Sequence, residues 1–175
     1  MKNSNFLNDP KIGIIGLGYV GLPLALEFGK KFHTTGFDIN LSRIQELLDG
    51  IDSTKEAKKL DFKLASKLTF TASLKGIKNC NIFIVTVPTP VDISNKPDLR
   101  PLEGACNAIG PYIQKDSIII FESTVFPGCT EEFCVPLLEK KSGLIFNKDF
   151  FCGYSPERIN PGDHARGVRD IVKVT

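Results

Sequence analysis

Strand-like runs alternate along the chain with longer segments whose apolar residues recur at helical spacing. The runs at residues 11–15, 34–38, 68–72, 81–87, 117–122, 150–154 and 171–175 predict about seven strands. Between them, residues 22–28, 41–48, 102–113 and 130–141 have helical patterns. Such alternation is typical of βαβ units. We therefore expect an α/β fold: a Rossmann-type doubly wound, mostly parallel sheet in a single domain at residues 11–175, after a leader at residues 1–10.

Two segments around the second predicted helix have clear local signals. Asn40 precedes the helix at residues 41–48 and is a candidate N-cap, and Gly50 follows as a stop signal. Residues 51–66 are charged and helix-prone, and we interpret them as a solvated face.

The first strand breaks into the pattern Gly16-x-Gly18-x-x-Gly21, and a helix follows directly. Gly16 allows a tight turn, Gly18 allows the backbone to approach phosphate oxygens, and Gly21 allows close packing of helix on strand. The helix N-terminus adds about half a positive charge at the same place. Strand, glycine turn and helix together predict a site for the pyrophosphate of a dinucleotide.

A carboxylate at the end of the second strand supports a dinucleotide and favours NAD. Asp38 follows Gly16 by about 20 residues, the offset typical of an acid that binds the adenosine ribose. This carboxylate would repel the 2′-phosphate of NADP. Arg43 weakens the preference for NAD, because an Arg nearby can bind the 2′-phosphate of NADP. The alternative is an ordinary βαβ unit with a surface Asp38.

Composition excludes several classes of protein. The 42% hydrophobic and 24% charged content is that of a globular domain, and the net charge of +2 with no basic run argues against a nucleic-acid partner. No apolar stretch approaches the roughly 20 residues of a membrane span, and no signal peptide is visible, so we expect a cytoplasmic protein.

Five cysteines and two histidines form no recognisable metal pattern. We expect free thiols, with Cys80, Cys106 and Cys152 as core residues. Cys129 and Cys134 lie near a predicted helix start, where a thiol can become nucleophilic, but no His accompanies either one.

The later strands also end in polar clusters, and ligands bind beyond the carboxyl ends of such strands. Thr89 and Thr124 could hydrogen-bond the nicotinamide half of a dinucleotide. Glu157 is a candidate for positioning water or transferring a proton, and Arg158 for an anionic substrate group. The alternative is that these residues only form strand-to-helix turns.

Five motifs occur in the same order in the nucleotide-sugar dehydrogenases, the UDP-glucose/GDP-mannose dehydrogenase family, which this chain resembles from Lys11 onward. They are Gly16-Leu-Gly-Tyr-Val-Gly-Leu-Pro23, Gly36-Phe-Asp38, Val87-Pro-Thr-Pro90, Glu122-Ser-Thr-Val-Phe-Pro-Gly128 and Ser155-Pro-Glu-Arg-Ile-Asn-Pro-Gly-Asp163. The last motif resembles the branch that oxidises UDP-N-acetylhexosamines.

The resemblance implies an enzyme that oxidises the sugar C6 alcohol to a carboxylate while reducing two NAD, with a cysteine nucleophile that forms a thioester. It assigns NAD contacts to the residues that match the family's motifs, namely Gly16, Gly18, Tyr19, Val20, Gly21, Asp38, Arg43, Thr89 and Thr124. Thr124 and Glu157 would position or activate water, and Arg158 and Ile159 would begin the substrate contacts.

The family's Gly-Gly-x-Cys motif and its catalytic Lys and Asn do not occur in the chain. We therefore expect an NAD-binding domain that does not turn over sugar by itself and forms a homo-oligomer only in a full-length protein. UDP-glucose or GDP-mannose oxidation and a non-catalytic dinucleotide-binding module remain alternatives. The hydroxyacid and 6-phosphogluconate dehydrogenases share the glycine turn but lack the later clusters.

Overall fold

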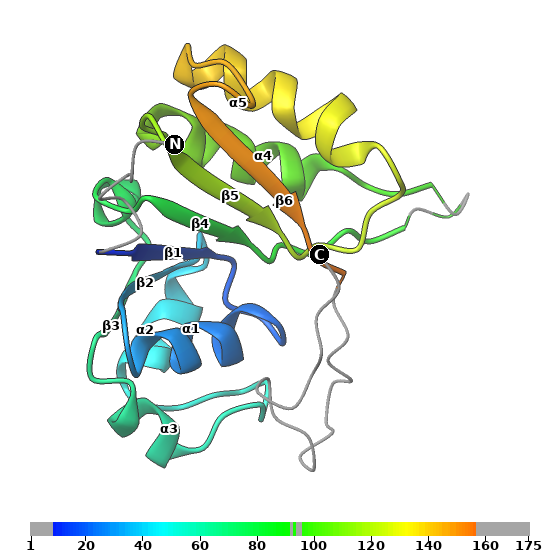
Figure 1. Cartoon of the computed structure of the whole chain (residues 1–175). Helices are drawn as coiled ribbons and strands as arrows, with labels where there is room; N and C mark the ends of the chain where they lie inside the picture. Colours follow the sequence, from blue (N-terminus) through cyan, green and yellow to red (C-terminus); the bar gives the residue numbers. More distant parts are fainter. Residues whose placement is uncertain (1–8, 92, 94–95, 157–175) are drawn as a thin grey trace.

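The computed structural model describes residues 9–91, 93 and 96–156, which form a sheet with helices on both faces (Figure 1). The strands are β1 (Lys11–Ile15), β2 (His33–Phe37), β3 (Leu68–Thr71), β4 (Ile82–Val85), β5 (Ser117–Phe121) and β6 (Phe150–Tyr154). The α-helices are α1 (Gly21–Gly29), α2 (Leu41–Leu48), α3 (Lys59–Leu64), α4 (Arg100–Ile109) and α5 (Val135–Ser142).

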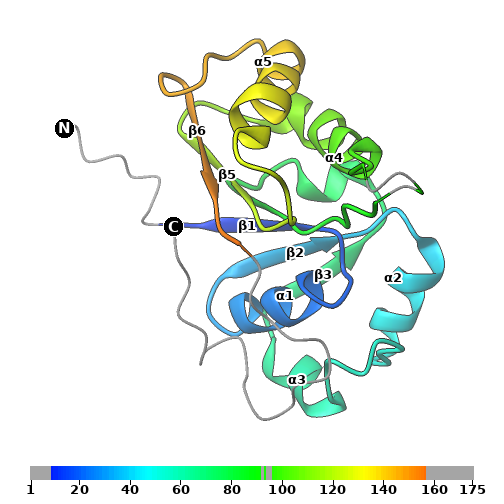
Figure 2. The same cartoon turned by 90° about the vertical axis from the view of Figure 1, so that its right-hand side faces the viewer.

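The sheet has the order β3-β2-β1-β4-β5-β6, and its strand pairs are all parallel. This is the doubly wound Rossmann order, so the predicted fold class is confirmed. Successive strands are added toward one edge of the sheet from β1 to β3 and toward the other edge from β4 to β6. Such folds bind ligands at this switch point, between β1 and β4. In Figures 1 and 2, α1 and α2 lie on one side of the sheet, and α4 and α5 lie on the other.

Continuous apolar runs form the central strands because both faces of the sheet are covered. Successive side chains point to opposite faces. In β4, Phe83 packs in the cluster on the α4 and α5 side, and Ile84 packs in the cluster under α1. Ile15 and Ile14 of β1 divide in the same way. Each fully buried side chain of this size stabilises the fold by roughly 1.5–3 kcal/mol.

The structure confirms most predicted elements and shortens several. Asn40 caps α2 as expected, since its side-chain oxygen accepts hydrogen bonds from the N–H groups of Ser42 (3.0 Å) and Arg43 (3.2 Å). Gly50, just beyond α2, has the left-handed φ of 69° that ends a helix.

Two predicted helices have different bounds in the structure, and one helix-prone stretch is only partly helical. The helix-prone stretch at residues 51–66 is helical only in α3, because the buried Asp52 accepts backbone N–H bonds that hold the preceding segment in a loop. The helix at 102–113 starts earlier, as α4, and ends in a 3-10 turn, Gly110–Tyr112. The helix at 130–141 begins with a π-helical turn, Thr130–Cys134. The strand predicted at residues 171–175 lies outside the described residues.

Candidate functional site

The carboxyl ends of five strands lie in one row. Ile15, the last residue of β1, pairs with Phe37 of β2 and with Val85 of β4. Phe121 of β5 continues the row beside Val85, and Tyr154 of β6 follows beside Phe121. The residues directly after these positions therefore meet at a single sheet edge. They are Gly16, Asp38, Thr86, Glu122 and Ser155.

The first and last glycines of the turn after β1 both resist a side chain, Gly16 by its backbone conformation and Gly21 by lack of room. Gly16 has a φ of 96°, which favours glycine. A Cβ on Gly21 would lie 1.9 Å from the Gly16 carbonyl oxygen and 2.5 Å from Thr86 Oγ1. Thr86 Oγ1 itself donates to the Gly16 carbonyl at 2.7 Å. The turn is thus held against both α1 and β4.

Gly18 has the opposite environment, because a Cβ placed there would meet nothing within 4 Å. Gly18 and Tyr19 are exposed, and no side chain caps α1 at Val20. The first turn of α1 also contains no acidic residue. Open space at Gly18 and an uncapped helix N-terminus suit a pyrophosphate group. The residues present therefore fit a dinucleotide.

Asp38 is oriented by two backbone donors at the end of β2. Its Oδ2 accepts from the Leu17 N–H at 2.9 Å, and its Oδ1 accepts from the Asn40 N–H at 2.9 Å. The carboxylate is half-buried next to the glycine turn, where a ribose would follow the pyrophosphate.

Thr89 and Thr124 come together at the ends of β4 and β5. The Thr89 hydroxyl donates to the Thr124 carbonyl, and the buried Ser123 donates from Oγ to the Val87 carbonyl at 2.6 Å. These bonds tie the two proline-containing turns into one surface. Thr124 is exposed and Thr89 is half-buried, so both remain within reach of a ligand at this edge.

Arg43 occupies a different environment from the one expected of a phosphate-binding arginine. Its side chain is buried and contacts Leu17, Glu46 and Asp52. The guanidinium is therefore already neutralised by carboxylates of its own chain.

The cysteines are buried or half-buried free thiols without features of a nucleophile. Burial raises the pKa of Cys80 to about 11 and the pKa of Cys152 to about 12. Burial, Cys134 and two nearby glutamates raise the pKa of Cys129 to about 11. The pKa of Cys134 is raised first by its hydrogen bond with Cys106 and then by burial. A thiol at the start of a predicted helix is therefore not activated here.

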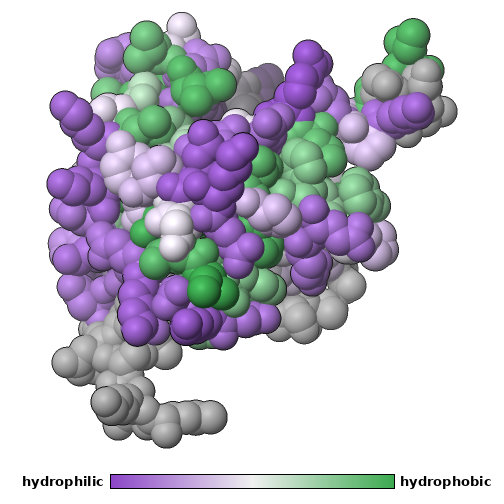
Figure 3. Space-filling view, turned by 90° about the horizontal axis from the view of Figure 1, so that it is seen from above, coloured by the Kyte–Doolittle hydropathy of each residue, from purple (hydrophilic) through white to green (hydrophobic). Residues whose placement is uncertain are grey.

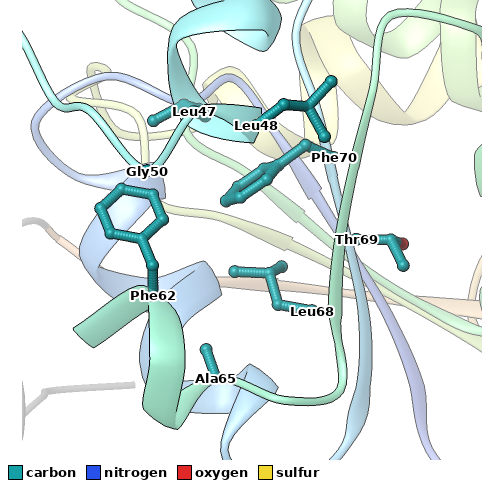
Figure 4. Close-up of a pocket in the computed structure, with 8 residues that line it drawn as sticks. All are labelled: Leu47, Leu48, Gly50, Phe62, Ala65, Leu68, Thr69 and Phe70. Atoms are coloured by element: carbon teal, nitrogen blue, oxygen red, sulfur yellow. The ribbon is translucent and has the colours of Figure 1, made fainter. Parts of the chain in front are cut away.

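An apolar groove of about 450 Å³ lies elsewhere, at the β3 edge of the sheet (Figure 4). Its lining comes from α2, α3 and β3 and includes Leu47, Phe62 and Phe70. None of the predicted site residues lines it.

Figure 3 shows hydrophilic and hydrophobic residues interspersed on the face seen from above.

Two features are absent from the described residues. These residues contain no group of three or more His, Cys, Asp and Glu side chains placed to hold a metal ion. Among the helices of residues 9–91 and 96–156, none is long and apolar enough to cross a membrane.

Residues 10–174 match the model of the UDP-glucose/GDP-mannose dehydrogenase family, NAD binding domain. The chain belongs to this family. The match confirms the resemblance inferred from the five motifs, and it makes NAD the cofactor of this domain.

Members of this family resemble the chain in both sequence and structure. The chain is 59% identical over 169 residues to UDP-N-acetyl-D-glucosamine 6-dehydrogenase of Pseudomonas aeruginosa, covering 97% of this chain and 40% of that protein. The structure of UDP-D-ManNAc dehydrogenase from Pyrococcus horikoshii superposes with a TM-score of 0.78 at 33% identity, covering 87% of this chain and 37% of that one. GDP-mannose dehydrogenase from Pseudomonas aeruginosa gives a TM-score of 0.81 at 26% identity, with 86% and 37% covered. The chain thus spans about two fifths of the length of its curated relatives.

Some predicted site residues cannot be placed, and two residues that support the site were not predicted. Glu157, Arg158 and Ile159 lie outside the described residues. Sequence reasoning did not single out Thr86, which closes the glycine turn, or Asp52, which pairs with Arg43. Thr86 could have been found as the hydroxyl residue near the carboxyl end of the strand predicted at residues 81–87. Asp52 has no local signal, because it lies in a stretch of mixed charge.

Proposed function

We propose that this NAD-binding domain serves a UDP-N-acetylhexosamine 6-dehydrogenase, which oxidises the sugar C6 alcohol to a carboxylate in two NAD-dependent steps. The product would be a UDP-N-acetylhexosaminuronic acid for surface polysaccharide. The observation that carries the proposal is the 59% identity to a UDP-N-acetyl-D-glucosamine 6-dehydrogenase across almost the whole chain. A second relative of the same name, from Salmonella typhi, is 50% identical. A third relative, Protein CapL of Staphylococcus aureus, is 51% identical.

The site residues divide into three roles in this proposal. Gly18 and the N-terminus of α1 receive the pyrophosphate, and Asp38 accepts hydrogen bonds from the adenosine ribose. Thr89 and Thr124 orient the nicotinamide half. NAD, when bound, supplies the hydride acceptor for each oxidation.

The substrate side would begin near Thr124. Thr124 and Glu157 would position or activate the water that releases the acid, while Arg158 and Ile159 would contact the UDP-sugar. These roles come from two family motifs, residues 122–128 for Thr124 and residues 155–163 for the other three.

We further propose that these 175 residues bind NAD without turning over sugar. The five thiols are buried or half-buried, so none suits the nucleophile of thioester chemistry. Their surroundings also raise the pKa values of Cys80, Cys129, Cys134 and Cys152. A complete enzyme containing this domain would work in the cytoplasm as a homo-oligomer, without a nucleic-acid or membrane partner.

Calorimetric titration of NAD into the 175-residue chain tests the cofactor role. Asp38→Ala should weaken binding by about 1–3 kcal/mol, because the ribose hydroxyls lose a charged acceptor. Asp61→Ala is the matched control, since Asp61 accepts the Lys58 N–H in α3, away from the glycine turn. A folded wild-type chain that binds no NAD would contradict the proposal.

A panel of nucleotide sugars tests the substrate class. The gene product that contains this domain would be assayed for NADH formation with UDP-GlcNAc, UDP-GalNAc, UDP-ManNAc, UDP-glucose and GDP-mannose. We expect the N-acetylhexosamines to be preferred. Preference for UDP-glucose or GDP-mannose would favour those branches instead, and NAD binding with no oxidation at all would favour a non-catalytic module.

A further inference from the structure

Arg43, in the first turn of α2, is held at three of its nitrogen atoms. Its Nε donates to the Leu17 carbonyl at 2.9 Å, inside the glycine turn. One terminal nitrogen lies 2.6 Å from Glu46 Oε1, and the other lies 2.8 Å from Asp52 Oδ1. The Arg43 side chain is only 10% exposed. A guanidinium with this set of partners has little freedom to turn toward a ligand.

Asp52 is the innermost member of this group, because its side chain has no exposed surface. Besides Arg43, it accepts from the Thr54 N–H at 3.1 Å and from the Thr54 hydroxyl at 2.6 Å. It also accepts from the N–H groups of Glu56 at 2.8 Å and Ala57 at 2.9 Å. One carboxylate therefore orders the loop after α2 and presents an oxygen to Arg43.

Leu17 connects this group to the ribose carboxylate. The Leu17 N–H donates to Asp38 and its carbonyl accepts from Arg43, so both of its backbone polar groups are held by charged side chains. The Leu17 side chain is fully buried. A continuous chain of hydrogen bonds thus runs from Asp38 through the glycine turn to Arg43 and on to Asp52.

The charges along this series of hydrogen bonds, from Asp38 to Asp52, do not cancel. One cation, Arg43, faces two carboxylates, Asp52 and Glu46, and Asp38 lies on the other side of Leu17. The adenosine end of the site is therefore negative overall, although it contains an arginine. A ribose with free hydroxyls suits such a site, and a 2′-phosphate does not.

We propose that Asp52 is a positioning residue that, with Glu46, holds Arg43 against the glycine turn and withholds it from a 2′-phosphate, so that the site selects NAD over NADP. The inference rests on the NAD site of the proposed function. It assigns cofactor selectivity to Asp52, which α2 separates from Asp38 in the sequence, in addition to Asp38 itself.

Calorimetric titrations of NAD and NADP into wild-type chain and Asp52→Asn test the inference. Asp52→Asn should weaken NAD binding and reduce the NAD-over-NADP preference by about fivefold, the effect of one partly screened charge pair. Glu46→Gln should shift the preference in the same direction by less, because Glu46 is more exposed than Asp52. The Glu46 variant also retains the loop contacts of Asp52, so it tests the inference even if Asp52→Asn folds poorly.

Two controls separate selectivity from a general loss of structure. Asp61→Asn removes a carboxylate that orders a neighbouring turn outside this group, and it should leave the preference unchanged. In an Arg43→Met background, Asp52→Asn should no longer alter the preference, because its effect passes through the guanidinium.

Three results would overturn the inference. The first is an equal loss of NAD and NADP affinity in both Asp52→Asn and Glu46→Gln, which would indicate a purely structural role. The second is an unchanged effect of Asp52→Asn without Arg43. The third is a folded wild-type chain that binds no NAD, and only this result would overturn the proposed function as well.

Discussion

Alanine substitution at the last two glycines of the turn should have opposite consequences for folding and for binding. Gly21→Ala should destabilise the fold, because the new Cβ would lie 1.9 Å from the Gly16 carbonyl oxygen. Gly18→Ala should leave the fold intact, because its Cβ would meet nothing within 4 Å. The two changes add the same methyl group three residues apart in sequence, so each is the control for the other.

The cost of Gly21→Ala follows from how the turn is held. The Gly16 N–H donates to the Phe37 carbonyl at 2.9 Å, and the Gly16 carbonyl accepts from Thr86 at 2.7 Å. Relief of the clash requires a shift of about 1 Å, which strains these bonds. We expect a loss of about 3 kcal/mol, near the upper end for overpacking. With a urea dependence of about 2 kcal/mol per M, the unfolding midpoint falls by about 1.5 M.

Gly18→Ala acts on the ligand instead. The added methyl group enters the open space beside the uncapped N-terminus of α1, where the backbone must approach phosphate oxygens. Loss of one or two hydrogen bonds to a charged group costs about 1.5–3 kcal/mol, which is a roughly tenfold to hundredfold weaker dissociation constant.

Urea unfolding followed by fluorescence or circular dichroism, together with NAD calorimetry, measures both effects. Gly18→Ala that binds NAD as tightly as the wild type would refute the assignment of this space to the pyrophosphate. Gly21→Ala with an unchanged unfolding midpoint would refute the packing argument, whatever its affinity for NAD.

Two further predictions concern titratable groups. The thiols of Cys80, Cys129 and Cys152 should react with a disulfide reagent at pH 7 only slowly, and rapidly in denaturant, because burial raises each pKa to about 11 or 12; fast labelling of native protein would contradict this. Burial opposes ionisation of Asp52, but hydrogen bonds from Thr54, Arg43 and the Ala57 N–H outweigh it, so its folded pKa is lowered from 3.8. Its contribution to stability is therefore complete above the unfolded pKa and is lost as pH falls through the folded pKa. Acid titration of unfolding should show a shallower loss below about pH 4 in Asp52→Asn than in the wild type, and parallel curves would count against the reasoning.

Local signals in the chain predicted the elements that form within a few residues of themselves. The turn from Gly16 to Gly21 was predictable because glycine spacing, the preceding apolar run and the following helical pattern agree. Asn40 was predictable as an N-cap for a similar reason, since capping depends on the next three backbone groups. The stretch at residues 51–66 is helix-prone, but only part of it is helical, because the Asp52 carboxylate accepts backbone N–H bonds from the segment before α3.

The site at the sheet edge was predictable only in part. Asp38, Thr89 and Thr124 follow strands, so a parallel sheet was expected to bring them to one edge. The direct contact of Thr89 with Thr124 depends on the pairing of β4 with β5, which no local pattern specifies. The role of Thr86 in closing the glycine turn depends equally on the pairing of β1 with β4.

Sequence by itself thus determined the fold class and the dinucleotide site, because both depend on short-range spacing of glycines, apolar runs and one carboxylate. The family followed from the resemblance of five ordered motifs. Tertiary structure decided the state of Arg43. From sequence this arginine could have served a 2′-phosphate, and only the fold brings Asp52 onto its guanidinium. The physical reason is that a side chain's charge is set by its own chemistry, whereas its neutralisation depends on which carboxylates the folded chain places beside it.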